Sequence, residues 1–121
     1  MTQEKINKAY PALMRLCGLR LPIKKARKLY ASTVKMKEYF DFALSEEQKY
    51  VEDFDGTMNP DGTVSFPSPE KFVGFQDRIT ELNESEVDWE IEPVIITELE
   101  VGDQQVSVND IIDLEGFVIF E

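Results

Sequence analysis

Histidine is absent from this chain of 121 residues, and cysteine occurs once, as Cys17. The absence of histidine removes the side chain that serves most often as a general base and as a zinc ligand. A single cysteine excludes a disulfide within the chain and is typical of a reducing cytosol. No catalytic or ligand motif stands out among the other residues. The sequence therefore argues against an enzyme, and we expect no cofactor and no bound metal.

The features that would place the chain in a membrane are also missing. No apolar run approaches the roughly 20 residues that a helix needs to cross a bilayer. The N-terminal residues lack the apolar stretch of a signal peptide, because Lys5 and Lys8 interrupt it. We therefore expect a cytoplasmic protein with no membrane partner.

Basic residues are missing from the last third of the chain. No lysine or arginine follows Arg78, whereas thirteen acids lie from Glu81 to Glu121. Residues 1–37 have the opposite bias, with ten bases against one acid, in a chain whose formal net charge is −11. The net charge disfavours direct binding to nucleic acid, which requires a positive field along the phosphates. A protein partner with a basic surface fits this charge better.

What the chain does contain fits one folded domain, since 42% of its residues are hydrophobic. The spacing of the apolar residues predicts three helices, over residues 3–17, 22–54 and 69–84. Pro11 indicates a kink in the first helix or a start near that residue. Ser45 could cap a restart within the second, although we favour one bent helix. Ser68 followed by Pro69 is a typical start for the third.

The segments between and after these helices have β character. Asn59, Pro60, Asp61 and Gly62 have the composition of a tight turn, which predicts a short β-hairpin between the second and third helices. From residue 86 the apolar period becomes two, which predicts a strand over residues 87–91. Residues 104–108 are a candidate second strand. Ser107 could cap a short helix before a final extended segment at residues 117–120.

The fold class that these elements predict is α+β and rich in helix. A long antiparallel helical hairpin would carry a β-turn at its tip and a small β element near the C-terminus. One domain would span residues 1–121, with a helical part over about 1–85 and an acidic mixed part over about 86–121. Cys17 should be buried on an apolar helix face. A single core should contain Leu29, Met36, Phe40, Phe72, Phe75, Ile79 and Leu82.

Parts of the chain resemble a known group of proteins. The run Lys-Ala-Tyr-Pro-Ala-Leu at residues 8–13, then Leu-Pro-Ile-Lys at 21–24 and a long charged helix, is similar to a family of small uncharacterised proteins of tailed phages and prophages of Gram-positive bacteria. Residues 59–62, 69–82 and 106–114 would be the other matching parts. The resemblance implies a helical fold and a phage product in the cytoplasm of a bacterial host. It supplies no catalytic residues.

The acids around the central turn are the first candidates for a ligand site. Asp53, Asp55, Asn59 and Asp61 offer oxygen ligands of the kind that bind Ca²⁺ or Mg²⁺. Their spacing is not that of an EF-hand, and solvated turn acids are the simpler interpretation.

Two charged segments are the candidates for binding a partner. A basic helix start could grip phosphates, but we favour pairing with the acidic C-terminal segment, within the fold or across a dimer. Trp89 is either a core residue, which we favour, or a binding anchor. The full candidate set is Glu86, Asp88, Trp89, Glu90, Glu92, Lys24, Lys25, Arg27 and Lys28.

These surfaces support two hypotheses about function. In the first, a non-enzymatic protein presents its acidic segment to a basic protein, as an inhibitor of a host defence or nucleic-acid-processing protein would. In the second, the charge division lets the protein self-associate as a structural or assembly accessory of a virion. A small enzyme is a third and weaker alternative.

Overall fold

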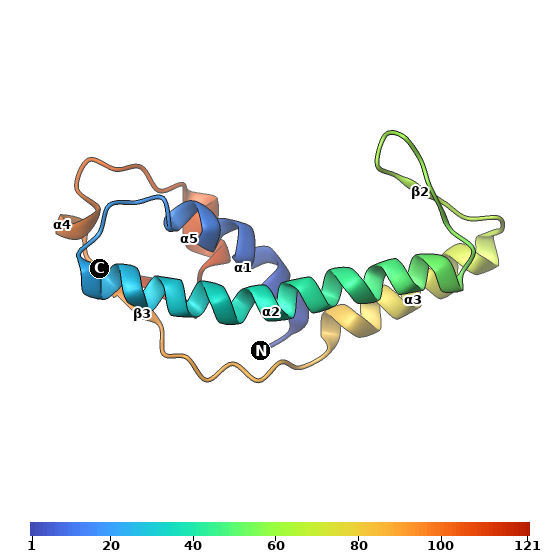
Figure 1. Cartoon of the computed structure of the whole chain (residues 1–121), viewed down its shortest axis with the longest axis horizontal. Helices are drawn as coiled ribbons and strands as arrows, with labels where there is room; N and C mark the ends of the chain where they lie inside the picture. The colour runs from blue at the N-terminus through green and yellow to red at the C-terminus, as the bar shows by residue number, and fades with distance from the viewer.

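The computed structural model describes residues 1–121 and has the helix-rich α+β fold that the sequence predicts (Figure 1). The molecule is elongated, with α2 running along most of its length. One end holds α1, the first half of α2 and the C-terminal segment, and the other end holds the second half of α2 with α3. The elements are α1 (Gln3–Leu16), α2 (Ile23–Asp53), β1 (Thr57–Met58), β2 (Val64–Ser65), α3 (Pro69–Glu84), β3 (Val94–Ile96), α4 (Glu98–Val101), α5 (Val108–Asp113) and β4 (Val118–Phe120).

Helix α1 is continuous across Pro11. It begins at Gln3, because the hydroxyl of Thr2 accepts a hydrogen bond from the backbone N–H of Lys5 and so caps the first turn. A start near Pro11 is therefore wrong. The buried face of α1 consists of Gln3, Ile6, Ala9, Ala12, Leu13 and Leu16.

Helix α2 is one helix of 31 residues, so no restart occurs at Ser45. Leu29, Met36, Ala43 and Tyr50 are buried at intervals of seven residues, which confirms the predicted stripe. The helix has no acid in its first turn, no base in its last turn and no side-chain cap at its start. Its charges oppose the helix dipole, so packing along the stripe must stabilise it.

Helix α3 lies alongside the second half of α2, as Figure 1 shows, which confirms the predicted helical hairpin. Ser68 caps α3 and Pro69 is its first residue. Gly74 lets the two helices approach closely, since a Cβ atom there would lie 2.5 Å from Cε1 of Phe54. The antiparallel pair β1–β2 projects at the tip, and Gly62 supplies the positive φ that its turn requires.

The expected single core is wrong, because the structure has two. The larger contains twelve buried residues from α1, the first half of α2 and the C-terminal segment. The smaller contains only Ala43, Tyr50 and Leu82, with Phe75 and Ile79 partly buried against it. The side chain of Phe72, expected in the core, is 45% exposed. At about 1.5 Å per residue α2 extends about 46 Å, so α1 and α3 cover its opposite ends rather than one common face.

The C-terminal β element differs from the expectation. Residues 87–91 and 104–108 form no strand. The strand is β3 instead, and it pairs in parallel with β4, with Val94 opposite Val118. The short helix capped by Ser107 is confirmed as α5. Alternating sequence alone does not make a strand, because the ladder also needs a neighbouring chain in register.

The C-terminal segment belongs to the larger core. Val94, Ile96, Leu114, Phe117 and Val118 all lie in it, beside residues of α1. The division of the molecule therefore crosses the middle of α2 as well as the chain near residue 86. We call residues 1–37 and 86–121 the compact end, and residues 38–85 the hairpin end.

Candidate interaction surface

Residues 86–93 form an extended segment that runs from the end of α3 to β3, and we call it the acidic strap (Figure 1). Val87, Trp89 and Ile91 are half-buried in it. The alternate acids Asp88, Glu90 and Glu92, together with Glu86, are exposed. The period of two therefore gave the correct facing of these side chains, although the segment is not a strand.

Trp89 fastens the strap to the larger core. Its ring meets that of Phe117 edge to face, with centroids 5.2 Å apart. Its indole Nε1 is buried without a hydrogen-bond partner. This placement favours the core role of Trp89 over that of a binding anchor, because the ring is already packed.

The strap is also held at its start. The backbone N–H of Val87 donates to the carbonyl of Met1 over 2.8 Å, and the hydroxyl of Tyr39 donates to the carbonyl of Asp88 over 2.8 Å. The N-terminal ammonium group lies 2.7 Å from the carboxylate of Glu86. Glu86 is thus paired within the protein.

The other three acids of the strap differ from Glu86. No base lies within ion-pair distance of Asp88, Glu90 or Glu92. Their charges are therefore open to a partner.

The four basic residues at the start of α2 differ in their surroundings. Lys25 is half-buried, donates to the carbonyl of Ile95 and lies 3.8 Å from the carboxylate of Glu100. Lys24, Arg27 and Lys28 are exposed and form no ion pair. The expected pairing with the C-terminal segment thus occurs for only one of these four bases.

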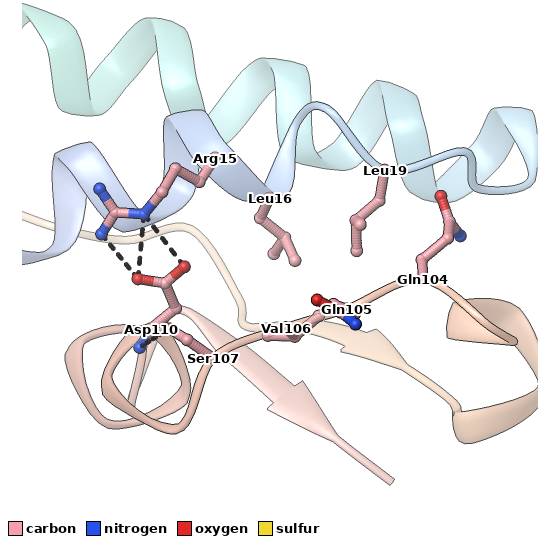
Figure 2. Close-up of a pocket in the computed structure, with 8 residues that line it drawn as sticks. All are labelled: Arg15, Leu16, Leu19, Gln104, Gln105, Val106, Ser107 and Asp110. Carbon is pink, nitrogen blue, oxygen red and sulfur yellow. Dashed lines mark hydrogen bonds and ion pairs between the residues drawn. The ribbon is translucent and has the colours of Figure 1, made fainter.

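A second pairing between the two charged regions was not predicted. Arg15 of α1 holds Asp110 of α5 in a forked contact, with Nε 3.1 Å from both carboxylate oxygens and Nη2 2.6 Å from one of them (Figure 2). The hydrogen bond from Arg15 lowers the pKa of Asp110, outweighing the opposing effect of desolvation. The residues are 95 positions apart, so local sequence carried no signal of the contact.

This ion pair lies at the edge of a cavity of about 650 Å³. Figure 2 shows Leu16 and Leu19 on one wall, with Gln104 and Gln105 on the segment that crosses opposite. Gln104 is bonded through its amide to the backbone N–H and carbonyl of Arg20. The one hydroxyl in the lining, that of Ser107, accepts the capping hydrogen bond from the backbone N–H of Asp110, and Arg15 directs its hydrogen bonds to the carboxylate of Asp110, so these polar groups have structural partners.

A second cavity, of about 390 Å³, lies between the end of α1 and the start of α2. Cys17 lines it and is exposed, which corrects the expectation that this residue is buried. Cys17 follows the last residue of α1, at the margin of the contact with α2, and its Sγ lies 3.2 Å from Oγ1 of Thr33. No base that could activate the thiol is in contact with it. The other residues lining the cavity are Met14, Leu19, Leu21, Ala26, Leu29 and Tyr30.

The acids of the central turn have local structural roles. The carboxylate of Asp61 accepts hydrogen bonds from the hydroxyl and the backbone N–H of Thr63, and these bonds lower the pKa of Asp61. Asp55 lies 3.3 Å from Nζ of Lys71. No three Cys, Asp or Glu side chains come together as metal ligands anywhere in the structure.

The fold redistributes the net charge. The compact end contains ten bases and twelve acids, a balance of −2. The hairpin end contains three bases and twelve acids, a balance of −9. The basic N-terminal region and the acidic C-terminal region thus largely neutralise each other, and the hairpin end carries most of the net charge of −11.

Comparisons with known proteins find no similar family, curated protein or solved structure. None of the helices combines the length and the apolar character needed to cross a membrane.

Proposed function

We propose that this protein is a non-enzymatic interaction protein that binds a partner with a basic surface through the acidic strap. The supporting observation is that alternate side chains of the strap face the core and the solvent. Trp89 fixes one side of the segment to the core, while Asp88, Glu90 and Glu92 project on the other side without internal partners. Fixed, unpaired charges attract an oppositely charged surface and set its orientation.

The partner class that this surface suits is a protein that binds nucleic acid. Three acids at every second position form a regular row of negative charge, which is the feature of a phosphate backbone that basic proteins bind. The resemblance to small phage proteins supports a setting in the cytoplasm of a bacterial host. We therefore propose inhibition of a host defence or nucleic-acid-processing protein as the specific role.

A charge-matched pair of variants tests this proposal. The first carries Asp88→Asn, Glu90→Gln and Glu92→Gln in the strap. The second carries Glu52→Gln, Asp77→Asn and Glu84→Gln at exposed, unpaired acids of the hairpin end. Both variants raise the net charge by three. The partner is isolated from host lysate with tagged wild-type protein, and its association with each variant is followed by stopped flow over a range of salt concentrations.

The strap variant should associate at least about tenfold more slowly than wild type, with a weaker dependence on salt, because surface charges act mainly on the association rate. The hairpin variant should lose much less. Equal association by both variants would show that total charge matters and that the strap is not the recognition surface.

A second candidate function is a virion assembly accessory that associates head to tail. The observation that favours it is the separation of unpaired charge along the molecule. Lys24, Arg27 and Lys28 lie at the start of α2, whereas the acidic hairpin end lies at the far tip (Figure 1). Open head-to-tail contacts of this kind build chains of copies. Sedimentation should then detect oligomers at low salt that dissociate as salt is raised, and a monomer at all salt concentrations would reject this function.

A further inference from the structure

The backbone of the acidic strap is open for pairing. None of the five backbone N–H groups of residues 88–92 donates to an acceptor in the protein. Of the carbonyls of the same residues, only that of Asp88 accepts a hydrogen bond. Backbone groups in folded proteins are normally paired, and this extended row of groups has almost no partner within the protein. Such a row is a template on which another chain can add as a strand.

One edge of the strap already begins an antiparallel pairing. The N–H of Gln3 donates to the carbonyl of Ser85 over 2.9 Å, and the N–H of Val87 donates to the carbonyl of Met1 over 2.8 Å. The bridge between Thr2 and Glu86 lies between these two bonds. The pairing stops at Val87.

The unpaired edge of the strap lies on the same side of the chain as the backbone groups of Val87. In an extended chain the N–H and C=O groups of one residue point to one edge, and those of the next residue point to the other. The carbonyl of Asp88 points to Tyr39 of α2. The groups of Trp89 and Ile91 therefore share the edge of Val87, beyond the point where its pairing ends.

We propose that the partner adds an extended segment, antiparallel to the strap, along the edge formed by Trp89 and Ile91. The lysines or arginines of that segment would stand opposite Asp88, Glu90 and Glu92. In this register the acids occupy the non-hydrogen-bonded positions, where facing side chains come closest. Opposite charges across a strand pair are stabilising, whereas a second copy of the strap would place acid against acid. This inference rests on the proposed function and specifies how the partner is bound.

Backbone methylation of a peptide probe tests strand addition separately from charge. The probe is a seven-residue peptide in which lysine alternates with threonine or valine. In the antiparallel register the amides of the threonine and valine residues point to the strap, and those of the lysines point to water. One variant of the peptide is N-methylated at two of the threonine or valine amides, and the control is N-methylated at two lysine amides.

Strand addition predicts that methylating the threonine or valine amides weakens binding by about tenfold or more, because two hydrogen bonds are lost. The lysine-methylated control should bind like the parent peptide. In hydrogen-exchange NMR, the amides of Trp89 and Ile91 should exchange more slowly when the parent peptide binds, while those of Asp88 and Glu90 should not change.

The other outcomes overturn the inference in different ways. Equal, salt-dependent binding by both methylated peptides would show that the acids attract the probe without backbone pairing, which rejects strand addition and leaves the proposed function intact. A larger loss in the lysine-methylated control would reject the antiparallel register. No binding by the parent peptide would also reject strand addition, and the strap variant and its natural partner would then decide the proposed function independently.

Discussion

The compact end and the hairpin end of this molecule differ in how much apolar surface they bury and in their charge. The compact end buries twelve residues in one cluster, and the hairpin end buries three. The compact end is nearly neutral, whereas the hairpin end carries a balance of −9. A charged helix pair with little buried apolar area has less to offset the repulsion among its acids. The comparison indicates a stable body at one end and a marginal arm at the other.

The largest effect should come from the core of the compact end. The side chain of Phe117 is 2% exposed and packs against Trp89, so Phe117→Ala should lower the free energy of unfolding by about 3–5 kcal/mol. Phe75→Ala, in the half-buried position of the hairpin end, should lower it by about 1–2 kcal/mol, because less surface is re-exposed. Denaturant melts of both variants measure the difference. Equal losses would contradict the ranking of the two ends.

A smaller effect should follow from filling the close contact in the hairpin. Gly74→Ala puts a Cβ atom 2.5 Å from the Phe54 ring, so the ring or the helices must shift. We expect a loss of about 1–3 kcal/mol, the usual range for overpacking. Hydrogen exchange should be faster in α3 and in the second half of α2, and unchanged in α1. Gly18→Ala, with its nearest atom at 3.2 Å outside the hairpin, is the control that should leave α3 unaffected.

The smallest effect should come from the ion pair that joins α1 to α5. Arg15 lowers the pKa of Asp110 in the folded protein, so this group contributes stability above its unfolded pKa, near 4. That contribution is lost as the pH falls through the lower folded value. Asp110→Asn should therefore destabilise the protein at pH 7, and its difference from wild type should shrink as the pH is lowered below the unfolded pKa. A difference from wild type that stays constant over this range would exclude the charge of Asp110 as the cause.

The helices show which parts of the fold can be predicted from neighbouring residues in the sequence. The caps at Ser68 and Ser107, and the stripe through Leu29 and Met36, act within a few residues of chain, so the sequence predicted α2, α3 and α5 correctly. The same reasoning misplaced the strand, because alternation at residues 87–91 reports which side chains face inward and says nothing of a pairing partner. It also missed the contact between Arg15 and Asp110, which depends on the approach of two distant helices.

The candidate surface likewise has features that local sequence predicts and features that depend on distant contacts. The sequence identified the acids of the strap and their outward direction, since a period of two decides the facing of an extended chain. It did not show that Glu86 is paired with the N-terminal ammonium group. It also did not show that Lys25 donates to the carbonyl of Ile95 and pairs with Glu100. Those pairings were not predictable because each joins segments that only the packing of the larger core brings together.

The sequence by itself determined the helices, the central turn, the inward and outward sides of the strap and the total charge, because each depends on neighbours within about one helical turn or on composition. The tertiary structure alone decided that there are two cores, that β3 pairs with β4, and that most of the net charge remains on the hairpin end. Each of these depends on contacts between residues far apart in the chain. The length of α2 accounts for the two cores, since it separates the segments that pack at its two ends.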